Sequence, residues 1–186
     1  MAREGWKAAQ GRWDSARLVF IDEAGAKTNL TRLRGRCPKG QRLHDETPGG
    51  HWSTTTMISS IRSDGSTAAM TIEGATTGEV FRAYVEHILV PTLRPGDIVV
   101  LDNLSSHKDK RAVELIEQTG AEVRPLPPYS PDLNPIEKMW SKVKALLRSA
   151  KARTDAALLE AIGSALHQVT ADDARGWFAS CGYSII

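Results

Sequence analysis

Two short apolar segments of this chain each end on an aspartate. Leu18-Val19-Phe20-Ile21 precedes Asp22, and Ile98-Val99-Val100-Leu101 precedes Asp102. The second segment shows no alternation of apolar and polar residues, which indicates a strand buried on both faces of a sheet. Because ligands of open α/β sheets bind at the carboxyl ends of the strands, the two aspartates are predicted to lie at such a binding edge.

A third acid, Glu137, follows a loop that is rich in proline. The loop contains Pro125, Pro127, Pro128 and Pro131. Prolines stiffen the chain, and a rigid loop is suited to positioning a metal ligand. Three converging carboxylates can hold divalent metal ions over a phosphate. The pattern therefore predicts a metal-dependent enzyme that cuts DNA.

Each of the three acids also has a purely structural explanation. Asp22 is compatible with the start of a turn, and Asp102 with a cap on the following helix. Asn134, Pro135 and Glu137 match the N-cap, first and third positions of a helix with a capping box. The four-proline loop exceeds what a helix start requires, which favours the functional interpretation.

The periodicity and the turn residues predict an α/β fold with a mixed sheet. Early strands with short links suit antiparallel pairing, whereas the later strand–helix–strand units require parallel strands with right-handed crossovers. We expect three antiparallel strands plus two parallel strands, flanked by helices, in one domain over residues 17–186 after an N-terminal linker or helix over residues 1–16. Expected β segments cover residues 17–21, 28–36, 54–61, 68–72, 98–101 and 122–126, and expected helices cover 77–91, 106–118, 134–150 and 155–169, besides a short helix that ends between 11 and 15.

Basic residues are segregated into two blocks although the net charge is only +2. Residues 24–44 hold six Lys and Arg and no acid, as do residues 138–153, so the rest of the chain carries −10. Each block follows a candidate catalytic acid, where a DNA backbone would need neutralising, although a solvated strand and a solvated helix face are the simpler alternatives. The candidate DNA contacts are Arg34, Arg36, Lys39, Arg42, His107, Lys138, Lys144, Arg148 and Lys151.

The two cysteines and the hydropathy pattern exclude several classes of protein. Cys37 and Cys181 are far apart and lack partners at zinc-site spacing, which predicts free thiols in a reducing cytoplasm. The first residues lack the apolar core of a signal peptide, and no apolar run approaches the roughly 20 residues that span a bilayer. We expect a soluble protein that makes no membrane contact.

Three motifs carry a resemblance to a known family. They are Phe20-Ile21-Asp22-Glu23, then Val100-Leu101-Asp102-Asn103-Leu104-Ser105-Ser106-His107, and then the segment from Pro127-Pro128-Tyr129-Ser130-Pro131 through Asp132-Leu133-Asn134-Pro135-Ile136-Glu137 to Trp140. Together they resemble DDE transposases of the mariner superfamily, in its bacterial insertion-sequence branch. Thirty-four residues separate Asp102 from Glu137, as in that branch. The resemblance extends over residues 17–177 and includes Gly50-His51-Trp52.

The resemblance implies a ribonuclease-H-like fold and a catalytic triad of Asp22, Asp102 and Glu137 that uses two Mg²⁺ or Mn²⁺ ions. The implied activity is DNA strand cleavage and strand transfer, with transposon ends and target DNA as partners. A homodimer in the DNA complex and a location at the bacterial nucleoid are also implied.

The chain departs from the family pattern at its start. Such transposases carry N-terminal helix-turn-helix units, whereas here about sixteen residues precede the first catalytic strand. Either a separately encoded helix-turn-helix part completes the protein or the chain is a truncated remnant. The alternatives are therefore an inactive remnant that only binds DNA and a related ribonuclease-H-like nuclease. A phospho-receiver domain fits less well, because Pro127 and Pro128 occupy the place of its lysine.

Several neighbours of the triad have expected roles outside metal binding. His107 is predicted to contact a phosphate or cap a helix, and Glu23 to point to the opposite face of its strand from Asp22. Trp52 and Trp140 are predicted to be core residues, with stacking on an unpaired base as the alternative for either.

Overall fold

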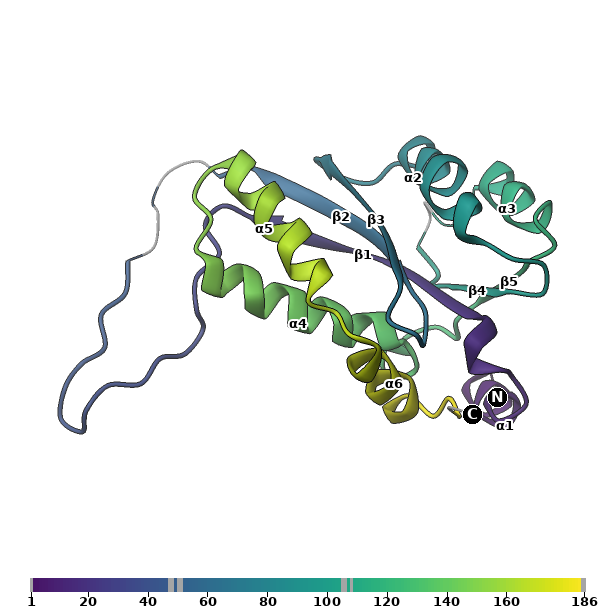
Figure 1. Cartoon of the computed structure of the whole chain (residues 1–186), viewed down its shortest axis with the longest axis horizontal. Helices are drawn as coiled ribbons and strands as arrows, with labels where there is room; N and C mark the ends of the chain where they lie inside the picture. The colour runs from purple at the N-terminus through teal and green to yellow at the C-terminus, as the bar shows by residue number, and fades with distance from the viewer. Residues whose placement is uncertain (1, 47–48, 50–51, 105–106, 108, 185–186) are drawn as a thin grey trace.

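The fold is built on a five-stranded mixed sheet, seen edge-on among the helices in Figure 1. The computed structural model describes residues 2–46, 49, 52–104, 107 and 109–184. The strand order is β3-β2-β1-β4-β5. The strands are β1 (Leu18–Lys27), β2 (Thr54–Ile61), β3 (Thr67–Glu73), β4 (Ile98–Leu101) and β5 (Glu122–Pro125). β1, β2 and β3 pair antiparallel, whereas β4 runs parallel to β1 and β5 parallel to β4. The predicted mixed sheet of three antiparallel strands plus two parallel strands is confirmed.

Helices cover both faces of the sheet (Figure 1). One face carries α4 (Pro135–Ala150), α5 (Asp155–His167) and α6 (Ala171–Ser180). The other carries α2 (Gly78–Tyr84), which continues as a π-helical turn over Val85–Leu89, and α3 (Lys110–Glu117). Alternate residues of β1 serve the two layers, since Leu18 and Phe20 join the first core and Val19 and Ile21 join the second.

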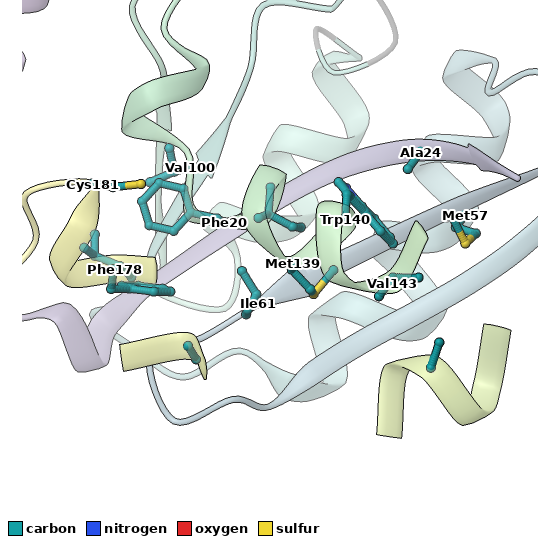
Figure 2. Packing of buried hydrophobic residues seen from close by; sticks show 14 of the residues in the cluster. Phe20, Ala24, Met57, Ile61, Val100, Met139, Trp140, Val143, Phe178 and Cys181 are labelled. Carbon is teal, nitrogen blue, oxygen red and sulfur yellow. The ribbon is translucent and has the colours of Figure 1, made fainter. Parts of the chain in front are cut away.

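The larger core lies between α4 and the centre of the sheet. Figure 2 shows Met139, Trp140 and Val143 of α4 over β1 and β2, with Phe178 of α6 closing one end. Buried residues recur along α4 at three- and four-residue spacing, which is the period of a helix with one face in the core. Trp140 is therefore a core residue, as predicted, and it fixes the rotation of α4 about its axis. That rotation decides which residues α4 presents at its other faces.

The N-terminal helix α1 (Ala2–Gln10) docks beside the C-terminal end of the chain. The indole N–H of Trp6 donates to the Tyr183 hydroxyl at 3.0 Å, and the side-chain amide of Gln10 donates to the Cys181 carbonyl at 2.8 Å. The Tyr183 hydroxyl donates in turn to the carbonyl of Leu133 at 2.7 Å. Both ends of the chain thereby support the loop that leads into α4.

Several predicted boundaries are wrong. The β segment expected at residues 28–36 forms part of an exposed loop between β1 and β2, which projects from one end of the sheet (Figure 1). Its leucine at position 33 is 78% exposed, and no neighbouring strand is placed to pair with it in the described part of the loop. α3 begins at Lys110 instead of near position 106, because Asp109 takes the N-cap. Trp52 is 50% exposed and faces Lys27 rather than the core.

β1 continues past Asp22 to Lys27, since β2 pairs with it there. α6 was not predicted. Gly50, His51, Ser105 and Ser106, which belong to the motifs, lie outside the described residues. No helix among the described residues is long and apolar enough to span a bilayer.

Candidate active site

The three predicted acids come together at the point where β1 and β4 part. Parallel pairing of these strands ends at Phe20 opposite Val100, and each aspartate lies two residues further along its chain. Glu137 reaches the same place from the first turn of α4. All three line one cavity of about 430 Å³. The cavity is completed by Asn103, Leu104, Asn134 and the loop Leu126, Pro127, Pro128, Tyr129, Ser130 and Pro131.

Asp22 is the most enclosed of the acids, with 7% of its surface exposed. Its Oδ1 accepts a hydrogen bond from the backbone N–H of Glu23 at 2.8 Å, and the Asn134 amide approaches Oδ2 at 3.5 Å. Burial raises the pKa of Asp22 to about 7, and the negative charges of Glu137 and Asp102 act in the same direction. A carboxylate in these surroundings favours a bound cation.

Asp102 is held from one side by His107. The His107 Nδ1 lies 2.6 Å from Asp102 Oδ1, which also accepts the Leu104 N–H at 2.9 Å. Burial acts to raise the pKa of Asp102, but these two hydrogen bonds outweigh it and keep the pKa below its ordinary value. His107 therefore stabilises the ionised form of Asp102, which is the form that binds metal.

His107 itself is enclosed between two acids. It is 3% exposed, its ring centroid lies 4.5 Å from that of Phe81, and its Nε2 lies 3.4 Å from Glu23 Oε1. Burial acts to lower the pKa of His107, but the neighbouring carboxylates of Asp102 and Glu23 outweigh it and raise the pKa to about 9. Both ring nitrogens face carboxylates, so the predicted phosphate contact is not supported by this arrangement. Glu23 faces the α2–α3 layer, opposite Asp22, as expected.

The start of α4 departs from the capping box that its sequence predicts. Asn134 occupies the N-cap and Pro135 the first turn, but the Asn134 side chain makes no capping hydrogen bond. Its amide is instead directed toward Asp22, and its Oδ1 is buried without a hydrogen-bond partner. Asn134 is thus a site residue that sequence reasoning assigned only to helix capping.

The donors around the cavity suit a hard divalent cation. Mg²⁺ and Mn²⁺ prefer carboxylate and carbonyl oxygens as ligands. Asp22, Asp102 and Glu137 supply carboxylate oxygens, and Asn134 Oδ1 supplies a carbonyl oxygen. Within the described residues no three acidic, His or Cys side chains are already placed to hold a single ion. The chemistry of the donor set fits, while closing the acids onto a metal requires side-chain adjustment.

The proline-rich loop is anchored by a residue far away in sequence. The Arg3 guanidinium donates to the Tyr129 carbonyl at 3.1 Å and to Ser130 Oγ at 2.7 Å. It also forms two hydrogen bonds with the Asp132 carboxylate, at 2.9 and 2.7 Å. No local sequence pattern predicts this contact, because Arg3 and Tyr129 are 126 positions apart in sequence.

The basic residues of the second block, residues 138–153, that belong to α4 lie on different faces of this helix. Lys144 and Arg148 follow Glu137 by seven and eleven positions, close to two and three full helical turns, and so share its face. Lys138 is exposed on another face. Lys142 also points elsewhere, since its ammonium donates to the Gln168 carbonyl at 2.7 Å and pairs with Asp173.

The first basic block lies at the far end of α4 from the acids. Arg34, Arg36, Lys39 and Arg42 are exposed on the loop between β1 and β2. Lys151 at the end of α4 pairs with Asp45 of this loop at 2.7 Å, and Arg153 donates to the carbonyls of Thr28 and Leu30. The two blocks are therefore joined in space, although each follows a different acid in sequence.

A mixed five-stranded sheet with acids at the junction of β1, β4 and α4 defines a ribonuclease-H-like domain of the kind found in transposases and integrases. Within that class, the chain belongs to the DDE superfamily endonuclease family, whose model matches residues 17–159. A sequence comparison with curated proteins finds no match.

Solved structures with this fold include transposase and integrase catalytic cores. The Mos1 transposase paired-end complex with left transposon end is 17% identical with a TM-score of 0.73, and the match covers 96% of this chain and 56% of that chain. The mariner Mos1 paired end complex with Mg is 20% identical with a TM-score of 0.58, covering 97% and 60%. The catalytic core domain of BIV integrase is 17% identical with a TM-score of 0.50, covering 80% and 82%. This chain thus spans little more than half the length of the Mos1 transposase chain.

Proposed function

We propose that this chain is the catalytic domain of a transposase, which cleaves DNA strands and transfers a freed 3′-hydroxyl into a target. The observation that carries the proposal is the convergence of Asp22, Asp102 and Glu137, from three separate elements, on one cavity. Membership of the DDE endonuclease family supports it. The Mos1 complexes solved with Mg and with Mn support the use of divalent ions.

In the proposed mechanism the three acids bind two divalent ions, Mg²⁺ or Mn²⁺. When bound, the ions supply the positive charge that activates the attacking water or 3′-hydroxyl and stabilises the leaving oxygen. His107 keeps Asp102 ionised and directed, and Asn134 orients Asp22. The loop held by Arg3 fixes the approach to Glu137. No residue needs to form a covalent intermediate.

The charge pattern suggests a path for the DNA backbone along α4. Glu137, Lys144 and Arg148 share a face, and Lys151 closes the helix next to the β1–β2 loop. At about 1.5 Å per residue, the fourteen residues from Glu137 to Lys151 extend roughly 20 Å, which is about six base pairs of duplex. Duplex DNA that enters at the acids would then meet Arg34, Arg36, Lys39 and Arg42.

The remaining parts of the assembly follow from this assignment. We propose a homodimer on DNA and a separately encoded helix-turn-helix part that recognises the transposon ends. The proposed catalytic domain covers residues 17–186. Residues 1–16 form the approach to it, with α1 supporting the proline-rich loop.

A plasmid-nicking assay in Mn²⁺ and in Mg²⁺ tests the proposed activity. Asp22→Asn, Asp102→Asn and Glu137→Gln should each abolish nicking, and Asp102→Asn should keep or increase DNA affinity because it removes a negative charge without changing shape. Glu160→Gln, which alters an exposed acid of α5, is the matched control and should cut like the parent. Unchanged cleavage by Asp102→Asn would overturn the assignment. DNA binding without cleavage in either metal would identify a binding-only remnant.

A further inference from the structure

One side chain at the rim of the cavity has no packing role. Tyr129 is 98% exposed, although tyrosine usually buries much of its large ring. It lines the cavity that holds the three acids. Leu104, 43% exposed, lines the same cavity two residues after Asp102. The acids are thus flanked by exposed apolar side chains.

The backbone of Tyr129 adopts a conformation that tyrosine disfavours. Its φ is 52°, in the left-handed region where Gly, Asn and Asp are the usual residues. A bulky residue persists there only where its surroundings enforce the conformation. Those surroundings are present, because prolines precede and follow Tyr129 and Arg3 holds its carbonyl at 3.1 Å. The fold therefore fixes the backbone of Tyr129, which presents an aromatic ring to solvent beside the acids.

We propose that Tyr129 is a stacking platform for a DNA base next to the phosphate held at the acids, an inference that rests on the proposed function. A phosphate at the acids brings the adjoining sugar and base to the rim of the cavity. An aromatic ring can stack on any base, because every base presents a π face. Stacking would hold an unpaired or frayed nucleotide at this rim and so set the position of the scissile phosphate.

The chemistry of the loop favours a nucleobase as the occupant. Prolines and Tyr129 supply apolar surface, and the Arg3 guanidinium of α1, which contacts this loop, is paired with Asp132. In this proposal the basic face of α4 contacts the DNA backbone, while the rim of the cavity contacts a base. Such a division positions DNA without selecting its sequence.

A fluorescent base analogue tests the platform directly. A duplex oligonucleotide with a short 3′ overhang carries 2-aminopurine at the junction, and Ca²⁺ replaces the catalytic metal during binding. Stacking on Tyr129 should quench the probe when the parent binds, and Tyr129→Phe should quench it equally. Tyr129→Asn should lose the quenching and weaken binding roughly 5- to 100-fold. Leu159→Asn, which alters an exposed leucine of α5, should behave as the parent.

Thermal unfolding separates stacking from a structural role. Because asparagine tolerates the left-handed region, Tyr129→Asn should melt at the same temperature as the parent or higher. A lower melting temperature for Tyr129→Asn would mean that the ring stabilises the fold, and would overturn the proposal. So would a parent that binds the oligonucleotide without quenching, or Tyr129→Asn that quenches like the parent. Failure of the parent to nick plasmid DNA would instead contradict the catalytic assignment. The failure of the stacking proposal and the failure of the catalytic assignment are therefore distinguishable.

Discussion

His107 Nδ1 and Asp102 Oδ1 lie 2.6 Å apart, so a predicted metal ligand is bonded to a buried imidazole. The imidazole is itself fixed by Glu23 at 3.4 Å and by the ring of Phe81. Groups that hydrogen-bond a metal ligand orient it and tune its affinity for the ion. The cluster therefore links the α2–α3 layer to the acids on the other side of the sheet.

Replacing His107 should weaken metal binding without removing a ligand. His107→Ala is expected to lower Mn²⁺ affinity, and the nicking rate at limiting Mn²⁺, by roughly 10- to 100-fold. His107→Asn retains an N–H near the Nδ1 position and should recover part of the loss. Titration calorimetry with Mn²⁺ measures the affinity directly. Equal Mn²⁺ affinity in His107→Ala and the parent would show that Asp102 needs no such support.

The pair formed by Arg82 and Asp109 should make stability depend on pH in the acid range. Asp109 Oδ2 lies 2.6 Å from Arg82, and its Oδ1 accepts the N–H of Ala112 at the start of α3. These contacts, that of Arg82 first, lower the pKa of Asp109 from 3.8 to about 2. A lowered pKa contributes stability that is present above the unfolded pKa and is lost as the pH falls through the folded value.

Asp109→Asn isolates this contribution, because asparagine can still cap α3. The difference in free energy of unfolding between the parent and Asp109→Asn should be constant above about pH 5 and should shrink between about pH 4 and pH 2. Urea unfolding at a series of pH values measures it. Glu114→Gln, in an exposed pair with Arg111, is the control and should change little. A difference that grows on acidification would contradict the assignment.

The basic face of α4 should account for part of the salt dependence of DNA binding. Changing Lys144 and Arg148 to Gln should reduce the log–log slope by up to about 1.8, since each phosphate contact contributes about 0.9. Binding should weaken for all sequences alike. The control changes Lys110 and Arg111 of α3 to Gln, an equal loss of charge on the opposite face of the sheet. Parallel salt titrations for the α4 variant and the parent would show that this face does not contact DNA.

Two glycines with the same backbone conformation should differ in their tolerance of a methyl group. Gly65 and Gly74 have φ of 85° and 84°. A Cβ at Gly65 would lie 2.8 Å from the N of Ala171 at the start of α6, whereas none of the atoms around Gly74 comes within 4 Å. Gly74→Ala should cost about 1–2 kcal/mol from the left-handed conformation alone. Gly65→Ala should cost about 1–3 kcal/mol more, because α6 has to move. Urea unfolding compares them, and equal losses would contradict the close contact.

The sequence predicted the structure correctly where the local residue pattern and the tertiary contacts favour the same conformation. β2 and β4 have the predicted bounds, because each β-rich segment is followed by charged or turn residues. The acids were identified because their motifs are local. α6 was missed although Thr170 and Asp173 form a capping box, a pattern that is visible in the sequence.

Other features had no local signal. Residues 28–36 were predicted as a β segment, but a strand requires a partner, and the structure provides none for the described residues of that loop. The sequence at Asn134 matches the usual N-cap pattern, yet its side chain makes no capping hydrogen bond and its amide is directed toward the buried carboxylate of Asp22. The anchor supplied by Arg3 depends on a contact between α1 and Asp132, which lies 129 positions further along the chain. The conformations of these residues are determined by tertiary contacts, which a local sequence pattern does not contain.

The division of the acids among β1, β4 and α4 also sets an order of events during synthesis. The ribosome releases β1 first, and it can pair with β2 at once, but its parallel partner β4 follows only after β3 and α2. Glu137 emerges later still, in the first turn of α4. A nascent chain therefore holds no complete set of acids until the first turn of α4 has been released. The cavity that the three acids line can thus assemble only after β1, β4 and the start of α4 have all emerged.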